Sequence, residues 1–435
     1  MSRLRLLLAI ALIAIPASAS AEPRPITLEE AVGLAQRNAL QVIQARGQAR
    51  TSGAAVRAAY AAFLPSVNLT AGATRQYISG ARTRVENGQI ITLPTEPWSS
   101  SAGLGASVDL FTGGQRFFDL RQARAKETAA SVNETAQGFG AALAAKQQYF
   151  NVLAARESQG AAMAQLEQAE LQRKTAIART NARVATRSDS LRAEIQYRTA
   201  QLAIVDARNA IETADASLTR VTGSPDLVTA APADSFEHPG LALEEAALRQ
   251  LALTGPAVRQ ASAELSAAKA AQKSAWTDYL PSLSASYSRS GSGSGSAPEL
   301  AGSDFAYTGA LRFTATLPIF NQWQREQRVT QAKVDQENAE AALRDARLAA
   351  VEALTQELGA FRSSEERVIS QAASVEAAEE DLRVQQQRYA VGASTLLDVL
   401  TSQTQLNEAR TNLIRARYDQ RIAKAQLEAL VGRGL

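Results

Sequence analysis

Residues 115–183 begin QRFFDLRQARAKETAASVNETAQ and continue for about seventy positions with almost no proline or glycine to interrupt a helix. A second stretch, residues 321–389, has the same property and contains only one glycine, Gly359. At ~1.5 Å per residue, each helix would be on the order of 100 Å long. No globular core can bury a helix of that length, so both stretches must pack lengthwise against other helices.

The last helix of each half carries a seven-residue repeat in which a column of large apolar residues lies beside a column of alanines. Heptads of this kind are typical of closely spaced coiled coils, which establishes architecture but not function. In the second half the columns are Val399, Leu406, Leu413 and Leu427, then Ala409, Ala416, Ala423 and Leu430. In the first half they are Tyr197, Ile204, Ile211 and Leu218, then Ala193, Ala200, Ala207, Ala214 and Val221.

The chain repeats itself once, at a spacing of about 210 residues. Phe63-Leu-Pro-Ser66 recurs as Tyr279-Leu-Pro-Ser282, and Leu110-Phe111 recurs as Ile319-Phe320. The period is far longer than a solenoid unit, so it indicates a duplicated half-protein. The predicted repeats are residues 22–223 and 241–435, and the predicted linker is residues 224–240.

Each half has the order helix, two strands, very long helix, turn and second long helix. The first helix is expected over about residues 27–63, starting at the capping signature Thr27-Leu-Glu-Glu30, and its counterpart over about residues 243–279. Pro65 and Pro281 forbid continued helix. The polar connections at residues 80–95 and 290–303 predict surface loops between the strands.

Four stretches alternate apolar and polar residues with a period of two, the signature of strands with one apolar face. They are residues 66–77, 100–111, 282–289 and 305–317. Lengths near ~10 residues suit membrane barrel strands. Four strands cannot close a barrel and open edges are not tolerated in lipid, so several subunits would have to contribute strands. A soluble antiparallel sheet gives the same alternation, and the strand pattern alone leaves both readings open.

Aromatic residues gather at the helix–strand junctions, where a membrane barrel carries an interfacial girdle. These residues are Phe63, Phe117, Phe118, Trp276, Tyr279, Phe320 and Trp323.

The N-terminus reads as a secretory signal peptide, with Arg3 and Arg5 before a short apolar run and with Ala19-Ser-Ala21 at its end. We expect cleavage after Ala21, so that residues 1–21 are removed. The chain has no cysteine, which excludes disulfides, thiolate metal sites and a lipid-modified cysteine. The net charge of +3 gives no electrostatic footprint for nucleic acid. No later stretch approaches the ~18 apolar residues of a transmembrane helix.

No constellation of residues suggests enzyme chemistry. His238 is the only histidine and lies in the linker, and one histidine without cysteine does not make a usual transition-metal site. The Gly-Ser tract at residues 290–296 is not followed by the lysine and helix of a phosphate loop. We therefore predict that the protein is not an enzyme and uses no metal and no cofactor.

The duplicated halves, the Leu-Pro-Ser turn and the run Tyr389-Ala-Val-Gly-Ala-Ser-Thr-Leu-Leu-Asp398-Val-Leu400 resemble the TolC family of outer-membrane efflux and secretion channels. The resemblance covers essentially all of the mature chain. Its most specific part is the last run, because family members carry a similar Tyr-x-x-Gly-x-x-x-x-x-Asp-Val-Leu at the turn between their last two long helices.

The resemblance implies a mainly α-helical fold with a membrane β-barrel. Very long coiled-coil helices would form an α-barrel tunnel across the periplasm, and each subunit of a homotrimer would give four strands to a twelve-stranded outer-membrane barrel. The implied function is a passive exit duct of a tripartite efflux pump or a type I secretion system. Its implied partners are a periplasmic membrane-fusion adaptor, an inner-membrane pump and outer-membrane lipid.

The resemblance also implies a closed iris at the inner tip of the tunnel. By position, Asp398 would ring the aperture, and Tyr389 and Asp189 would form interhelical gate contacts. The chain departs from the family at Thr401, where a second aspartate is common, and at Ser394, where a basic gate residue is common. The double acidic ring and the gate salt bridge are therefore not expected in the family's form.

A helix cap explains the two acids as well, since Thr186-Arg-Ser-Asp189 and Thr395-Leu-Leu-Asp398 both fit the capping pattern. The two roles are compatible. The turns themselves would form the tips of the tunnel and contact the adaptor, and otherwise are tight αα turns. The tip residues are Val184, Ala185, Val391, Gly392 and Ala393.

A soluble periplasmic coiled-coil adaptor or scaffold is the alternative function. It would explain the long helices but not four lipid-suited strands with aromatic residues at their junctions. A periplasmic hydrolase has no residues to support it.

Overall fold

The computed structural model describes residues 23–77, 83–86, 88–92, 98–232, 240, 244–295, 297, 298 and 305–435. The expected signal peptide, His238 and part of the expected linker lie outside the described residues. The chain divides into two units, and each is described by itself. The first consists of Met1–Ile43, Gln137–Ala252 and Glu352–Leu435, and the second of Gln44–Ala136 and Leu253–Val351.

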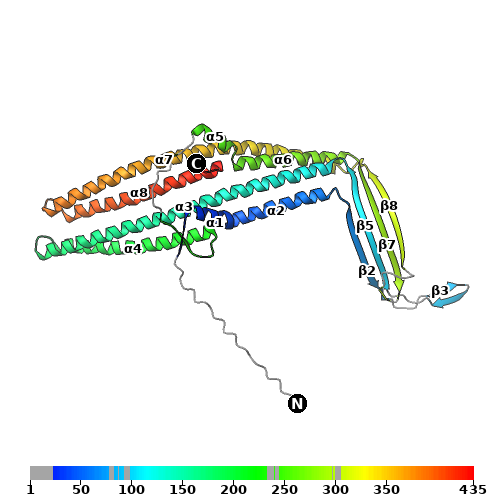
Figure 1. Cartoon of the computed structure of the whole chain (residues 1–435), viewed down its shortest axis with the longest axis horizontal. Coiled ribbons are helices and arrows are strands. Elements are labelled where there is room, and N and C mark those ends of the chain that lie inside the picture. Colours follow the sequence, from blue (N-terminus) through cyan, green and yellow to red (C-terminus); the bar gives the residue numbers. More distant parts are fainter. Residues whose placement is uncertain are drawn as a thin grey trace, which may run out of the picture. The chain divides into compact units, whose positions relative to one another are not determined.

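Two very long helices run through both units, as the uninterrupted stretches predict. They are α3, Gln115–Asn181, and α7, Gln324–Ala390, each of 67 residues (Figure 1). Each is followed by a second long helix, α4 at Arg187–Thr222 or α8 at Leu396–Val431. The mainly helical fold class is therefore confirmed. No helix in the described part of the chain has both the length and the apolar character that crossing a membrane requires.

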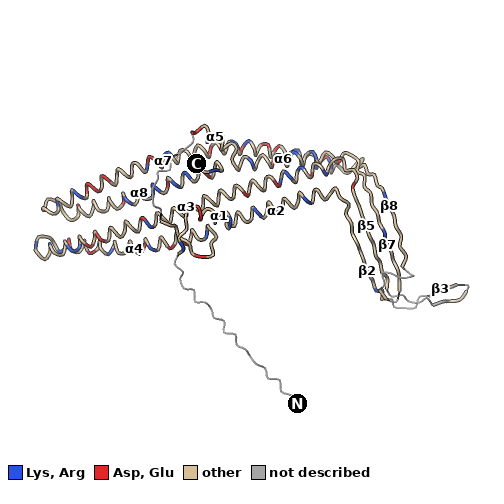
Figure 2. Tube along the Cα trace, in the orientation of Figure 1, with Lys and Arg blue, Asp and Glu red and all other residues tan. Residues whose placement is uncertain are grey.

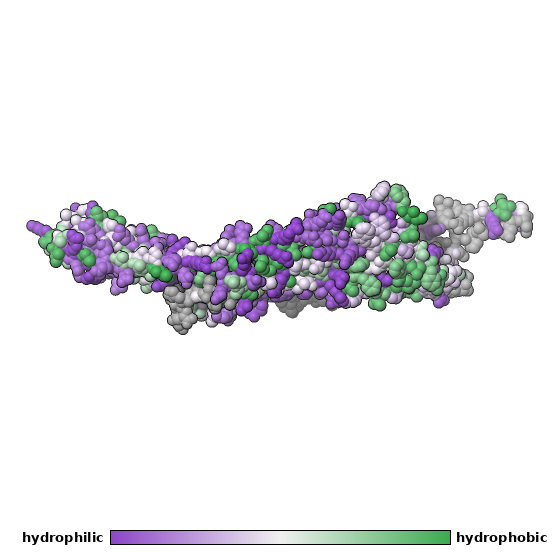
Figure 3. All heavy atoms as spheres, turned by 90° about the horizontal axis from the view of Figure 1, so that it is seen from above, coloured by the Kyte–Doolittle hydropathy of each residue, from purple (hydrophilic) through white to green (hydrophobic). Residues whose placement is uncertain are grey.

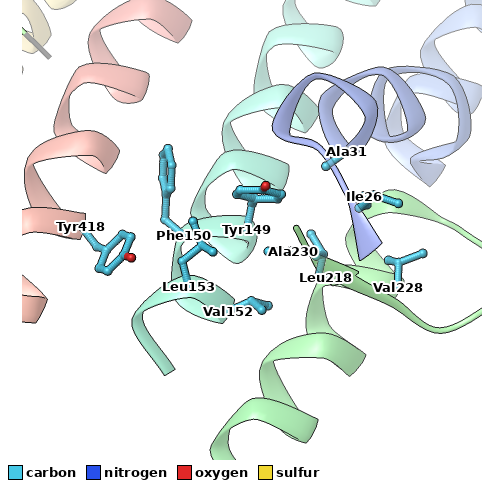
Figure 4. Packing of buried hydrophobic residues seen from close by; sticks show 10 residues of the cluster. All are labelled: Ile26, Ala31, Tyr149, Phe150, Val152, Leu153, Leu218, Val228, Ala230 and Tyr418. Carbon is cyan, nitrogen blue, oxygen red and sulfur yellow. The ribbon is translucent and has the colours of Figure 1, made fainter. Parts of the chain in front are cut away.

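The first unit contains a small parallel sheet that the sequence analysis did not predict. Strand β1, Arg24–Ile26, pairs with β6, Val228–Ala230. Both are covered by the helices α1, Leu28–Asn38, and α4, and by α3. The close view in Figure 4 shows their side chains among aromatic and aliphatic residues of α1, α3, α4 and α8. This buried cluster is Ile26, Ala31, Tyr149, Phe150, Val152, Leu153, Leu218, Val228, Ala230 and Tyr418.

The second unit is built on an antiparallel four-stranded sheet of order β2-β5-β7-β8. Its strands are Ser66–Arg75, Trp98–Thr112, Ser282–Gly295 and Ala306–Thr316. All residues of β2 and β8 are exposed, and Figure 3 shows apolar side chains gathered in the region of the sheet. Helix α2, Leu40–Ala61, and helix α6, Pro256–Trp276, lead into the sheet, the latter through the 3-10 turn η1, Thr277–Tyr279.

The first helix of each half is broken, which corrects the prediction of one continuous helix. In the first half Ala39 leaves the helix with ψ 133°, and Gly223 packs so closely on Asn38 that a Cβ at Gly223 would lie 2.9 Å from the Cβ of Asn38. In the second half, α5 at Glu245–Leu253 is separated from α6 by Gly255 as N-cap and Pro256 as first helical residue.

Both predicted loops contain strands, which is a second correction. Residues 290–295 continue β7 and pair with β5, with Gly291 opposite Ala102 and Gly295 opposite Trp98. A side chain at Gly291 would overlap the rings of Phe305 and Tyr307, so the glycine is needed for close packing. In the other connection, Thr83–Glu86 and Gln89–Thr92 form the short hairpin β3-β4.

Candidate gate at the helix turns

The α3–α4 and α7–α8 turns have the same backbone construction. At the first, Arg183 has φ 60° and the amide of Val184 donates to the carbonyl of Arg179 at 3.0 Å. At the second, Gly392 has φ 79° and the amide of Ala393 donates to the carbonyl five residues earlier at 2.8 Å. Both helices therefore end in a Schellman motif. Glycine takes the left-handed position without strain, whereas Arg183 does so at an energetic cost.

Each turn is followed by a capping box that uses the acid predicted for the gate. The Asp398 carboxylate accepts the amide of Thr395 at 2.8 Å, and the Thr395 hydroxyl accepts the amide of Asp398 at 3.3 Å. Thr186 and Asp189 form the same pair at 3.0 and 3.3 Å. The threonine amide and then its hydroxyl hold the pKa of each carboxyl group below its usual value. Both acids are helix caps in this chain, and the aperture ring of Asp398 stays a prediction.

Ser394 and Thr401 have different surroundings. The Ser394 hydroxyl lies 2.9 Å from the Asp398 carboxylate and 3.1 Å from the side-chain oxygen of Gln385, so it joins the turn to α7. The Thr401 hydroxyl donates to the carbonyl of Leu397 at 2.9 Å. Thr401 also lines a groove of about 320 Å³ between α4 and α8. The other residues of this groove are Arg192, Ile195, Gln196, Leu397, Leu400 and Thr404.

Tyr389 reaches the first-half helix through Arg179. The Arg179 guanidinium lies 4.6 Å from the ring centroid of Tyr389, and its Nη1 donates to the Tyr389 carbonyl at 3.3 Å. Among the described residues no hydrogen bond joins Tyr389 to Asp189, because the Asp189 carboxylate is engaged by Thr186. Within one chain, the interhelical contact expected for Tyr389 is thus made with Arg179.

The contact leaves polar atoms unpaired. In the part of the chain that the structure describes, the Tyr389 hydroxyl and the Nε of Arg179 are buried without a hydrogen-bond partner. An unpaired buried polar atom costs ~1–3 kcal/mol, so a rearrangement or a neighbouring copy that supplied partners would relieve this cost.

Two arginines of α3 were missed by the sequence analysis. Besides Arg179, Arg173 stacks on the Tyr197 ring at 4.4 Å and donates to Glu194 at 3.1 Å, joining α3 to α4. For Arg179 the available signal was a basic residue in the last turn of a helix, which is favourable beside the helix carbonyls. That signal does not identify the neighbouring helix, so the contact could not be inferred.

The predicted tip residues lie at the surface of the two turns. Val184 is 65% exposed and Val391 81% exposed. Gly392 and Ala393 are also exposed, whereas Ala185 is half-buried. The exposed valines are available to a partner.

The predicted girdle residues lie in the second unit, at the ends of the sheet strands. The structure brings four of them together in two ring pairs, Phe63 with Phe117 at 5.2 Å and Trp276 with Tyr279 at 5.4 Å. The other three are Phe118, which is half-buried, and Phe320 and Trp323, which are 72% and 70% exposed.

Comparison with known proteins gives relatives over most of the chain. Protein CyaE of Bordetella pertussis is 28% identical over 359 residues, which cover 78% of this chain and 71% of that protein. Outer membrane protein TolC of Escherichia coli is 26% identical over 299 residues, 65% of this chain and 59% of TolC. The Campylobacter jejuni CmeC outer membrane channel has the same fold, with a TM-score of 0.76 at 18% identity over 93% of this chain and 85% of that one.

Long paired helices joined to a four-stranded sheet thus define a class of fold shared with outer-membrane channels. The model of the family described as outer membrane efflux protein matches residues 31–224 and 247–433. The chain belongs to this family, and the resemblance inferred from its sequence is confirmed. Its location is the outer membrane, with extension into the periplasm. The family is one of efflux proteins and not of enzymes.

Proposed function

We propose that three copies of this chain form a passive channel through the outer membrane and a tunnel through the periplasm. The assembly serves as the exit duct of a tripartite efflux pump or a type I secretion system. A membrane-fusion adaptor and an inner-membrane pump complete it, and the chain itself performs no chemistry. Membership of the outer membrane efflux protein family supports this proposal.

The observation that carries the proposal is the pair of outer edges of the sheet. Among the described strands, β2 and β8 each have only one neighbour in this sheet. Both carry exposed apolar residues, such as Leu69 at 78% and Phe313 at 63%. In lipid, unpaired backbone groups cost several kcal/mol each, so sheet edges must be paired in a closed ring. Other copies of the chain supply the missing edges.

The duplication says how the copies meet. Gly113 in the turn after β5 packs on Leu280, so closely that a Cβ at Gly113 would lie 2.7 Å from the Cβ of Leu280. The equivalent turn after β8 holds Gln322, and the equivalent leucine is Leu64, which is 68% exposed. Within one chain this second leucine precedes the outer strand β2. We infer that Gln322 of one copy packs against Leu64 of the next.

The turns act as the gate in this proposal. Contacts such as that of Arg179 with Tyr389 hold the long helices together in the closed form, and an adaptor at the exposed tip valines favours their separation. The bonds from Thr395 lower the pKa of Asp398 and so favour its charged form, and three symmetry-related carboxylates attract cations. Ser394 and Asp189 stabilise the same turns through local hydrogen bonds.

The test is single-channel conductance of the purified mature protein in a planar bilayer. Wild type is expected to give discrete, cation-preferring steps, and Asp398→Ala to weaken the preference. Thr395→Ala is the matched control, because it removes the cap hydroxyl and keeps the carboxylate. Equal effects of both variants would reduce Asp398 to a cap. A protein that stays soluble without detergent and never inserts would overturn the duct in favour of a periplasmic scaffold.

A further inference from the structure

Each strand–helix junction holds an arginine against an aromatic ring. Arg116 lies 5.0 Å from the Phe63 ring centroid and donates to the carbonyl of Ala62 at 3.1 Å. Arg325 lies 4.0 Å from the Tyr279 ring and donates to the carbonyl of Pro318 at 3.2 Å. The two halves therefore share a construction in which a cation fixes a ring and satisfies backbone oxygens where the sheet ends.

One of these junctions exposes a tryptophan at a backbone cost. The first junction turns through Gly113 and Gly114, with φ 62° and 88°. The second turns through Gln322 and Trp323, with φ 59° and 62°. Left-handed conformations cost such residues ~1–2 kcal/mol each. Trp323 is nonetheless 70% exposed. An indole ring in water would not offset this backbone cost, whereas an indole ring at the interface of a bilayer is stabilised.

The helix ends next to the sheet concentrate positive charge, as Figure 2 shows. The twelve residues nearest the sheet in each of the four helices that lead to or from it carry eleven Lys and Arg and four Asp and Glu. Their net charge is +7, whereas that of the whole chain is +3, so the rest of the chain is net negative. These windows are residues 50–61, 115–126, 268–279 and 324–335.

The four acids in these windows are already engaged. Asp278 pairs with Arg328, and Glu326 with Arg325 at 3.1 Å. Hydroxyl and amide donors occupy the remaining two, since Ser274 donates to Asp119 and Gln331 to Asp335.

Several cations, by contrast, are exposed directly behind the aromatic residues. Arg121 and Arg124 follow Phe117 on one face of α3, at helical spacings of four and seven. Lys273 precedes Trp276 by three on α6. In the described part of the chain, Arg121 and Lys273 form no ion pair, and Arg124 only stacks on Tyr60 at 5.1 Å. These cations lie ~5–10 Å farther from the sheet than the rings.

We propose that the junction aromatics and the cations behind them, Arg121, Arg124 and Lys273, form a binding surface for anionic phospholipid headgroups of the periplasm-facing leaflet. The inference rests on the proposed membrane-spanning function. Rings at the headgroup level with basic side chains just outside match the order of a bilayer surface, from acyl chain to glycerol to phosphate. Because the four acids near the sheet are already engaged, they do not neutralise Arg121, Arg124 and Lys273. The uncompensated positive charge favours phosphatidylglycerol over a zwitterionic lipid.

The experiment is native mass spectrometry of the detergent-solubilised full mature chain, titrated with phosphatidylglycerol or phosphatidylcholine. The test variant combines Arg121→Gln, Arg124→Gln and Lys273→Gln. The control combines Arg187→Gln, Arg208→Gln and Arg220→Gln on exposed positions of α4, which remove the same charge elsewhere. Wild type and control should retain phosphatidylglycerol preferentially, and the affinity of the test variant for phosphatidylglycerol should be at least about tenfold lower. Lysine in place of glutamine at positions 121 and 124 should restore most of this affinity.

Equal retention of phosphatidylglycerol by wild type and test variant, or equal losses in test and control variants, would overturn the headgroup surface. Channel insertion separates this outcome from failure of the proposed function. Proteins that conduct in a bilayer but show no phosphatidylglycerol preference contradict only the headgroup surface. Wild-type protein that neither inserts nor binds either lipid contradicts the duct itself.

Discussion

Arg179 is the residue through which α3 meets α7 at the helix turns. It combines a stacking contact with Tyr389 and a hydrogen bond to the Tyr389 carbonyl. A stacked guanidinium contributes ~0.5–2 kcal/mol depending on its desolvation. That range is large enough to affect a closed state that differs from the open state by a few kcal/mol.

Removal of this contact should favour the open channel. For Arg179→Ala we expect the open probability in single-channel recordings to rise by roughly two- to thirtyfold, following the stacking energy. The open probability of Arg179→Lys should lie between those of wild type and Arg179→Ala, since an ammonium group cannot reproduce the planar stack. Arg183→Ala, at an exposed arginine of the same turn, is the control, and an equal rise there would contradict the specific role of Arg179.

Asp215 offers a pH-dependent prediction in the first unit. It is 4% exposed and accepts the Thr229 hydroxyl at 2.6 Å, and burial raises its pKa. A raised pKa means that the folded chain favours the protonated group, so this contribution to stability is present below the unfolded pKa and is lost as pH rises through the folded pKa. Asp215→Asn should therefore raise Tm at pH 7, and the gain should shrink toward pH 4. Asp206→Asn, exposed on the same helix, should show no such pattern.

At the scale of elements, the two helix turns share one backbone construction but have different residues at the left-handed position. The left-handed residue is Arg183 in the first turn and Gly392 in the second. Each turn has the same Schellman bonds and capping box. Substitutions at this one position therefore test the backbone cost of a side chain there.

Exchanging glycine at these positions should act in opposite directions. Arg183→Gly is expected to stabilise the chain by about 1 kcal/mol, because the left-handed strain is removed, and Gly392→Ala to destabilise it by about the same amount. Nothing lies within 4 Å of a Cβ added at Gly392, so crowding does not contribute. Thermal unfolding of both variants checks this, and two shifts of the same sign would contradict it.

At the scale of the whole molecule, the duplication predicts a contact between copies. The packing of Gly113 on Leu280 inside the chain has its counterpart in Gln322 and Leu64, which are on the outer strands' side of the sheet. Because the sequence lacks cysteine, this contact can be tested by disulfide formation without a background.

The variant Leu64→Cys with Gln322→Cys should form covalent trimers on mild oxidation, visible on a non-reducing gel. Each copy would present position 64 at one edge of its sheet and position 322 at the other, so each disulfide would join two neighbouring copies. Leu64→Cys with Leu348→Cys, a 71% exposed position on α7, is the control and should stay monomeric. If both variants formed cross-linked species in equal amounts, the disulfides would come from random collision, and this would contradict the predicted contact between copies.

The sequence by itself determined the local features of this protein. The uninterrupted stretches predicted both 67-residue helices, the Thr-x-x-Asp signatures predicted the caps at Asp189 and Asp398, and the alternating stretches indicated where the sheet lies. These signals act between residues a few positions apart, through capping bonds, backbone sterics and side-chain periodicity. They therefore need no knowledge of the neighbouring elements.

Only the tertiary structure decided the features that depend on residues far apart in the chain. The break at Ala39 accompanies close packing of Gly223, and the Gly-Ser tract becomes strand because β5 pairs with it and aromatic rings cover Gly291. The partner of Tyr389 is Arg179, some 210 residues away. Such contacts depend on which helix faces and strand edges meet. The local sequence of a polar or glycine-rich stretch does not indicate which element it will contact.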